Sequence, residues 1–228
     1  MQRRSALLYA TAALTMSLPS TPAQAEDGRD TILVVLRHTA DASRDDDAFA
    51  PVATLQVPLP NGTTAAMAPA WFDLIGDLQA RLVYVAADSM RTLHAEELAA
   101  LALAPEQALA VALANLERLH GAPVAQPWHN LQAVKGRSED FDSSYFLDRA
   151  FWRRLLADHP DGLVVAVPRT DLLLFTPLSD TAAVDSLRQG VAGLHAGGGD
   201  YRLSSALYLF KDDRWRVFQP AAPTPVAA

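Results

Sequence analysis

Residues 162–175 read GLVVAVPRTDLLLF and hold two apolar runs with a short polar interruption between them. The first run extends from Gly162 to Val167 and the second from Leu172 to Phe175. Unbroken apolar runs of this length are typical of strands that are buried on both faces. Pro168 fixes its own backbone angle and cannot donate a backbone hydrogen bond, so it ends the first run. The stretch therefore predicts two buried strands close together in the sequence.

The same pattern recurs toward both ends of the chain. Ile32 to Leu36 and Leu82 to Ala86 are further apolar runs and predict two more buried strands. Val52 to Leu59 alternates weakly and runs into proline, asparagine and glycine, which predicts a strand that leads into a turn. Ala206 to Phe210 and Trp215 to Phe218 predict a C-terminal β-hairpin. This hairpin requires some antiparallel pairing.

The region from His94 to His120 is rich in Ala, Leu and Glu, which favour helices. We expect two helices here, one from Ala95 to about Leu101 and one that begins at Pro105 and ends at Gly121. The second helix carries leucines at intervals of three to four residues, which predicts one buried stripe. These leucines are Leu109, Leu113, Leu116 and Leu119, and Asn115 is the polar exception beside them.

Other segments give shorter signals. Pro69 to Gln79 places apolar residues at helix-like spacing, and Asp148 and Ser179 are positioned to cap two further helices. Residues 123–142 are irregular and polar, and residues 144–147 predict a short strand.

This mixture of strands and helices predicts an α/β (α+β) fold. We expect a single mixed-sheet domain over residues 29–219, with packed helices and the C-terminal hairpin. No linker or internal repeat calls for a second domain. Residues 220–228 are Ala- and Pro-rich and are expected to form a disordered tail.

The first 25 residues have the features of a signal peptide. Arg3 and Arg4 precede an uncharged apolar segment, and Ala23-Gln24-Ala25 has the small-x-small form that signal peptidase cleaves. The apolar segment is shorter than the roughly 20 residues that span a bilayer, although an uncleaved anchor is the alternative. We therefore expect a periplasmic or secreted protein with cleavage near Ala25. The adjacent arginines leave the general and the twin-arginine export routes both open.

Charge and composition exclude several classes of function. The whole chain has a net charge of −7; without the two arginines of the signal peptide, 17 basic residues face 26 acidic ones, a net charge of −9. Nucleic-acid binding needs an excess of basic residues, and an acidic chain is also repelled by anionic lipid. We therefore expect no nucleic-acid partner and no stable membrane insertion after cleavage. The chain has no cysteine, so disulfides, thiolate metal sites and cysteine nucleophiles are excluded.

Sequence motifs for cofactors and metals are missing. Gly197 to Gly199 follows a predicted helix, which is the wrong order for a nucleotide-binding loop. There is no Gly-x-Ser-x-Gly and no His-Glu-x-x-His motif. His120 and His129 flank a loop, but a histidine at a helix C-terminus is also explained by the helix dipole. We expect neither a cofactor nor a metal.

Two polar clusters are candidates for chemistry. The first is Glu139, Asp140, Asp142, Ser143 and Ser144. Paired carboxylates beside hydroxyls can perform acid–base or nucleophilic chemistry, but a solvated capping loop has the same composition. The second cluster is Arg169 and Asp171, which lie at the end of a predicted strand, where a functional pair and a structural turn are both common.

Residues 82–116 resemble an uncharacterised bacterial family, domain of unknown function 1444 (DUF1444). The resemblance rests on Leu-Val-Tyr-Val-Ala-Ala-Asp-Ser from Leu82, the acidic start Glu96-Glu97-Leu98, Leu-Ala-Pro-Glu-Gln-Ala-Leu from Leu103, and Ala114-Asn115-Leu116. In the second half it rests on residues 140–144, on Phe151-Trp152 and on residues 164–175 with Pro168 and Asp171.

The resemblance covers roughly residues 32–218 and departs from the family pattern at three places. Asp142-Ser143 stands in place of Glu-Ala, Arg169 is displaced from its place beside Asp171, and Ala104 stands where a capping serine is expected. The resemblance implies a shared fold. It implies no reaction, cofactor or partner.

Three functions remain open. The first is a non-enzymatic binding or interaction module for an unknown protein or small-molecule ligand. The second is a hydrolase-like enzyme that uses a carboxylate, arginine and serine cluster at strand ends. The candidate residues for this cluster are Asp88, Asn115, Asp142, Ser143, Arg169 and Asp171. The third is an assembly role in the cell envelope.

Overall fold

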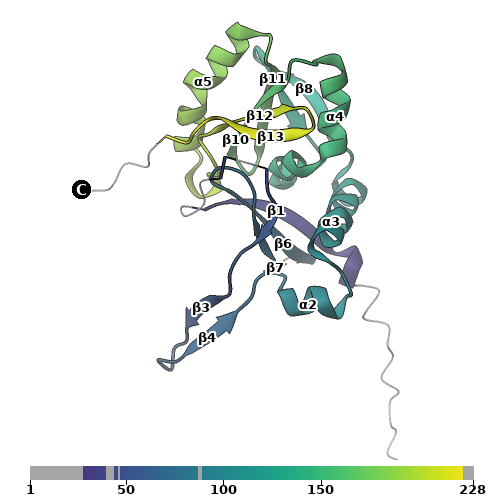
Figure 1. Cartoon of the computed structure of the whole chain (residues 1–228), viewed down its shortest axis with the longest axis vertical. Helices are drawn as coiled ribbons and strands as arrows, with labels where there is room; N and C mark the ends of the chain where they lie inside the picture. Colours follow the sequence, from purple (N-terminus) through teal and green to yellow (C-terminus); the bar gives the residue numbers. More distant parts are fainter. Residues whose placement is uncertain (1–27, 40–43, 46, 87–88, 223–228) are drawn as a thin grey trace, which may run out of the picture.

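Two antiparallel sheets, one from each half of the chain, form the frame of the protein (Figure 1). The computed structural model describes residues 28–39, 44–45, 47–86 and 89–222. The predicted signal peptide, residues 1–25, and the tail from residue 223 lie outside the described residues. Every strand pair in the described part of the chain is antiparallel. The predicted fold class is confirmed as a mixed α+β fold with a C-terminal hairpin.

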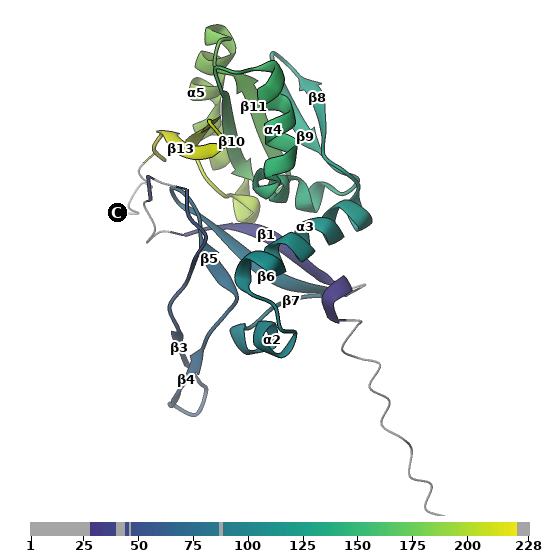
Figure 2. The same ribbon diagram turned by 45° about the vertical axis from the view of Figure 1, so that its right-hand side comes forward.

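The first sheet is built on the apolar run at Ile32. Its members are β1 (Ile32–His38), β6 (Leu78–Ala86), β5 (Trp71–Asp73) and β2 (Ala50–Pro51) in that order, with β7 (Ser89–Thr92) also paired to β6. Residues 32–36 are all buried, as expected of a strand that is covered on both faces. A separate hairpin, β3 (Leu55–Pro58) and β4 (Thr64–Met67), projects away from this sheet (Figures 1 and 2).

The second sheet contains the two strands predicted from residues 162–175. Its order is β13 (Arg214–Gln219), β12 (Leu207–Lys211), β10 (Leu163–Arg169), β11 (Leu172–Pro177), β9 (Leu131–Lys135) and β8 (Val124–Trp128). Pro168 and Arg169 do not interrupt β10 but extend it through an irregularity in its register with β11. The proline is tolerated because the pairing is already irregular at this point.

Within the described residues, four α-helices of six or more residues cover the sheets: α2 (Ala95–Ala100), α3 (Pro105–His120), α4 (Arg149–Asp158) and α5 (Thr181–Ala196). The six-stranded sheet lies between α4 and α5 (Figure 2). Trp152 of α4 and Leu116 of α3 belong to one apolar core that both sheets share, whereas Val184 and Leu187 of α5 form a second core on the opposite face. Two 3-10 helices, η1 (Glu139–Leu147) and η2 (Gly199–Tyr201), complete the fold.

The two helices expected between His94 and His120 are confirmed, and Gly121 ends α3 with a φ of 80°. The buried stripe of α3 is rotated from the predicted one. Ala108, Ala112 and Leu116 are buried together with Asn115, while Leu119 is 43% exposed. Small alanines face the core because α3 packs closely on β1, and the larger leucines lie at its flanks.

Several local predictions were wrong. Residues 69–79 form β5, a turn and the start of β6 rather than a helix, since Trp71 and Phe72 alternate between the two sides of a strand and Gly76 adopts a φ of 58°. Residues 123–142 contain the hairpin of β8 and β9; Pro127 is accommodated because β8 is an edge strand. Residues 144–147 belong to η1 instead of a strand.

The cap of α5 and the start of the C-terminal tail also differ in detail from the predictions. The cap of α5 is Asp180, whose carboxylate accepts a 3.0 Å hydrogen bond from the Ala183 N–H, rather than Ser179. Asp148 caps α4 as expected. The first residues of the predicted tail contact the body, because the Ala222 N–H donates a 2.9 Å hydrogen bond to the Ser205 hydroxyl.

Candidate functional site

The helix η1 lies where the two sheets meet and carries the first predicted cluster. It contacts β1 of one sheet and β9, β10 and β11 of the other. Phe141, Tyr145 and Phe146 are buried at helical spacing, which fixes η1 in the shared core. The intervening residues Asp142 and Ser143 are carried inside with them.

Asp142 is fully buried and paired with Lys135, a residue that the sequence analysis missed. The Lys135 Nζ lies 2.8 Å from Asp142 Oδ2, in an orientation outside hydrogen-bond geometry, and the Gly136 N–H donates a 2.9 Å bond to Oδ1. Burial raises the pKa of the Asp142 carboxyl, and this effect exceeds the opposing ones of Lys135 and Gly136. Lys135 lies inside residues 123–142, which were predicted to be irregular, and a sequence reading that placed it on a strand beside η1 would have found the pair.

Four of the six residues proposed for a hydrolase come together around this lysine. The Ser143 N–H donates to the Thr170 carbonyl at 3.0 Å, which fixes η1 to the turn between β10 and β11. In that turn Arg169 binds Asp171 through two hydrogen bonds of 2.8 and 2.6 Å. Lys135 Nζ also donates a 3.3 Å bond to the Asp171 carbonyl. The cluster thus joins η1, β9 and the β10–β11 turn.

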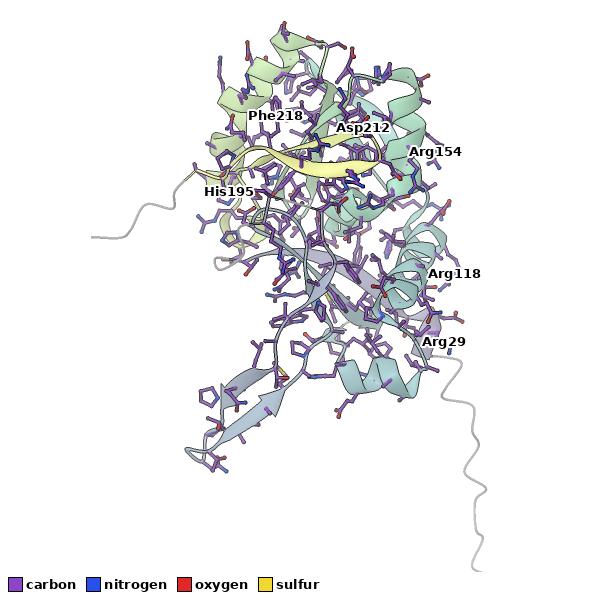
Figure 3. All side chains as sticks on the ribbon, in the orientation of Figure 1. Arg29, Arg118, Arg154, His195, Asp212 and Phe218 are labelled. Atoms are coloured by element: carbon purple, nitrogen blue, oxygen red, sulfur yellow. The ribbon has the colours of Figure 1, made fainter. Side chains whose placement is uncertain are left out.

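The other two candidates lie elsewhere. Asn115 of α3 donates from Nδ2 to the carbonyls of Arg29 and Ile32, at 2.7 and 3.0 Å. Arg118, in the last turn of α3, supports it by donating to Asn115 Oδ1 and to the Asp30 carbonyl. Figure 3 shows Arg118 and Arg29 near one another. Asn115 therefore holds the start of β1 against α3. Asp88 lies outside the described residues.

The cluster around Lys135 offers little access to a substrate. Asp142, Ser143 and Ser144 are between 0 and 1% exposed, and the buried Ser144 hydroxyl has no hydrogen-bond partner among the described residues. Arg169 and Asp171 are already paired with each other through two hydrogen bonds. A nucleophile or general base needs contact with the reacting atoms, so this arrangement favours a structural role for the cluster.

A cleft of about 490 Å³ opens beside this cluster, between the two sheets. Its hydroxyl-bearing lining residues are Ser89, Thr170 and Tyr201, and its charged ones are Arg37, Asp140, Asp200 and Arg202. Its apolar lining includes Val35, Val85, Met90 and Phe141. Met90 and Tyr201 are 45% and 62% exposed, which is unusual for large side chains of this type. Ligand sites combine apolar walls with a few polar groups in this way.

Arg37 is the unusual charge in the cleft. Burial lowers the pKa of its guanidinium, and Nη1 donates a 2.8 Å hydrogen bond to the carbonyl of the neighbouring Leu36, the one side-chain hydrogen bond of Arg37 within the described residues. No carboxylate in the described part of the chain pairs with it. Burial lowers the pKa of Arg81, which lies on the same face of the sheet, and the charge of Arg37 lowers it further. An unpaired, partly buried guanidinium is a favourable place for an anion.

A larger hollow of about 640 Å³ lies against Phe49 and Trp215 at another junction of the two halves. Its Arg149 is already paired with Asp47, and its Asp213 is paired with Arg153. Asp47 also accepts a 3.1 Å bond from the Trp215 N–H. Because Arg149 and Asp213 already have ion-pair partners, we interpret this hollow as part of the contact between the two halves of the chain.

His38, Asp77 and Ser204 have the composition of a catalytic triad but not its geometry. The His38 Nδ1 lies 3.3 Å from one Asp77 oxygen, while the Ser204 hydroxyl donates a 2.6 Å bond to the other. In a triad the histidine stands between the serine and the carboxylate. Here the carboxylate stands between them, so His38 cannot take the serine proton. The group links the β5–β6 turn to the second sheet.

No cluster of three or more His, Asp or Glu side chains suited to a metal occurs among the residues that the structure describes. Within the same residues, no helix is long and apolar enough to cross a membrane. Comparison with known proteins found no matching family, no matching curated protein and no matching solved structure. The resemblance to DUF1444 therefore stays a prediction.

Proposed function

We propose that this chain is an exported, non-enzymatic binding module that takes a small zwitterionic ligand in the cleft between its two sheets. The observation that carries the proposal is Arg37, a half-buried guanidinium in the cleft without a carboxylate partner in the described residues. An anionic group of a ligand would satisfy it and would relieve its repulsion with Arg81. Export rests on the signal peptide predicted at residues 1–25.

The distribution of charge in the cleft supports a ligand with both signs. Arg37 is the partly buried charge, whereas Asp140 and Asp200 are exposed. A carboxylate at Arg37 would therefore place an ammonium group of the same ligand toward these two aspartates. Amino acids and short peptides have this chemistry, and the apolar side chains Met90 and Phe141 would contact their carbon skeleton.

The hydrolase alternative has less support. Its candidate residues Asp142 and Ser143 are buried, and none of its described candidates lines the cleft. No hydroxyl in the described cluster is hydrogen-bonded to a histidine that could act as its base. A binding role requires no such base.

Calorimetric titration and thermal-shift measurements test the proposal on the full chain. The panel contains amino acids and dipeptides, with the matching carboxylic acids and amines alone. We expect a zwitterion to bind and to raise Tm, and the single-charge compounds to bind more weakly. Arg37→Gln should weaken binding at least about tenfold, because it removes a charge-assisted hydrogen bond.

Arg154→Gln is the matched control, since it removes the same charge from an exposed position on α4 (Figure 3), and Arg154 is not among the residues that line the cleft. It should leave binding unchanged. If no zwitterion binds, or if Arg37→Gln binds as well as the native chain does, the proposal is wrong.

A further inference from the structure

The hairpin of β3 and β4, residues 55–67, is here called the arm. It projects from the first sheet in both views of the molecule, and its two strands pair only with each other (Figures 1 and 2). A two-stranded hairpin is marginally stable by itself and leaves unpaired backbone groups on both edges. The arm therefore has both the reach and the open edges that pairing with another chain requires.

The arm lies within the longest uncharged stretch of the chain. Residues 48–72 contain no Asp, Glu, Lys or Arg, although 20% of all residues are charged. Exposed edge strands are ordinarily protected from pairing by charged side chains, above all lysine. This edge has no such protection. Because the arm has no charged side chain, it is suited to a partner segment that is also uncharged. The arm of a second copy is such a segment, although the whole chain has a net charge of −7.

The two edges of the arm differ in the number of outward-pointing backbone N–H groups. The Leu59 N–H donates to the Thr63 carbonyl at 2.8 Å, which sets the alternation of the ladder. By that alternation, the outward backbone groups belong to Gln56 and Pro58 on β3 and to Thr64 and Ala66 on β4. Pro58 has no N–H, so the β3 edge lacks a donor. The β4 edge keeps both of its donors and is the edge suited to pairing.

We propose that two copies of this chain associate through their β4 strands, antiparallel about a two-fold axis at Ala65. In this register the outward groups of Thr64 meet those of Ala66 of the second copy, and Ala65 faces its own counterpart. Residues that lie opposite each other across the seam point to the same side of the sheet. The half-buried Leu55, Val57, Ala65 and Met67 of both copies therefore form one continuous apolar face.

The pairing unites two hairpins into a four-stranded sheet. Only small side chains, alanine and threonine, meet at the new seam, so the strands can approach without a clash. Stable interfaces bury about 1,200–2,000 Å² in total, more than four-residue strands provide, so the expected complex is a weak, concentration-dependent dimer. The proposal is independent of ligand binding in the cleft.

Sedimentation velocity over a wide concentration range tests the association. The native full chain should show a monomer–dimer equilibrium. Ala66→Lys places a charge on the pairing edge and should weaken the dimer at least about tenfold. Gln56→Lys is the matched control, because Gln56 lies directly opposite Ala66 on the other strand, is equally exposed, and undergoes the same charge change. It should leave the dimer nearly unchanged, and thermal unfolding confirms that both variants fold.

Disulfide cross-linking tests the register. The chain has no cysteine, so a single introduced thiol gives a clean result. Ala65→Cys should form a covalent dimer on mild oxidation, because directly opposite residues at a non-hydrogen-bonded position lie close enough for a disulfide. Ala192→Cys, exposed on α5, should cross-link far more slowly.

Three outcomes would overturn the proposal. The first is a monomer at every concentration. The second is equal behaviour of Ala66→Lys and Gln56→Lys. The third is cross-linking of Ala65→Cys that is no faster than that of Ala192→Cys.

Discussion

The Tyr208 hydroxyl donates a 2.8 Å hydrogen bond to the Asp77 carboxylate and so ties the second sheet to a turn of the first. Tyr208 is fully buried, and its ring also packs within 3.1 Å of the position where Gly76 would carry a Cβ. The Ser204 hydroxyl shares the same carboxylate oxygen. This small network is one of the main polar links between the two halves.

Tyr208→Phe should destabilise the protein by about 1–2 kcal/mol, because the partly buried Asp77 carboxylate loses a hydrogen bond from a buried hydroxyl while the ring packing is kept. Urea unfolding measures the change. Tyr201→Phe removes a hydroxyl from a residue that is 62% exposed and should have little effect. Equal losses in both variants would show that the Asp77 bond contributes no special stability.

Lys135→Met should cost about 2–4 kcal/mol of unfolding free energy, since it leaves the buried Asp142 carboxylate without its cation. Lys211→Met makes the same chemical change where no ion pair occurs in the described residues, and should cost less than about 0.5 kcal/mol. Chemical denaturation of both variants, compared with the native chain, tests the difference. A native-like Lys135→Met would mean that Asp142 is satisfied without the lysine.

Asp142→Asn should change how stability depends on pH. Burial raises the pKa of the folded Asp142 carboxyl, so the folded state binds this proton more tightly than the unfolded state. The contribution of Asp142 to the free energy of unfolding is fully present below the ordinary carboxyl pKa, and it is lost as pH rises through the raised pKa of the folded state. The asparagine cannot titrate. The stability of Asp142→Asn relative to the native chain should therefore increase with pH across that window.

Asp213→Asn supplies a control of opposite sign for this measurement. A hydrogen bond from Arg153 lowers the pKa of Asp213, so its stabilising contribution is present above the ordinary carboxyl pKa and is lost as pH falls through the lowered one. The stability of this variant relative to the native chain should decrease as pH rises. Unfolding curves at a series of acidic pH values test both signs, and a flat difference for Asp142→Asn would contradict the assignment.

Gly190→Ala should stabilise the protein by about 0.5–1 kcal/mol. Gly190 lies within α5, a Cβ there meets nothing within 4 Å, and alanine favours helix over glycine by about this amount. Gly136→Ala should do the reverse and cost about 1–3 kcal/mol, because its Cβ would lie 2.5 Å from the Tyr145 hydroxyl. Thermal unfolding of the pair checks both directions, and a destabilised Gly190→Ala would show that α5 needs flexibility at this position.

The apolar runs and helix ends were predictable because their signals are local. Residues 162–175 and 32–36 read as buried strands and are buried strands, and Pro105 and Gly121 bound α3 as expected. The failures came where tertiary contacts decide. Residues 69–79 match a helical period, but pairing with β6 makes Trp71 to Asp73 a strand. Pro127 suggested an irregular segment, yet an edge strand tolerates it.

The candidate site was predicted only in part. Asp142, Ser143, Arg169 and Asp171 do lie close together, since strand-end and loop residues meet at η1. The burial of Asp142 and Ser143 could not be predicted from their polar side chains, because they are buried by the packing of their neighbours Phe141, Tyr145 and Phe146 in the core. Arg37 gave no sequence signal at all. Its significance depends on which carboxylates surround it, and that is a property of the folded chain.

The bond between Asp77 and Tyr208 joins residues 131 positions apart in the sequence. This contact between the two halves can therefore form only after β12, near the C-terminus, has been synthesised. Contacts of such long range slow folding, because the chain must close a large loop before they form. A chain that folds late stays unfolded for longer after synthesis, and the unfolded form is the one that the general export route, one of the two routes expected from residues 1–25, can carry.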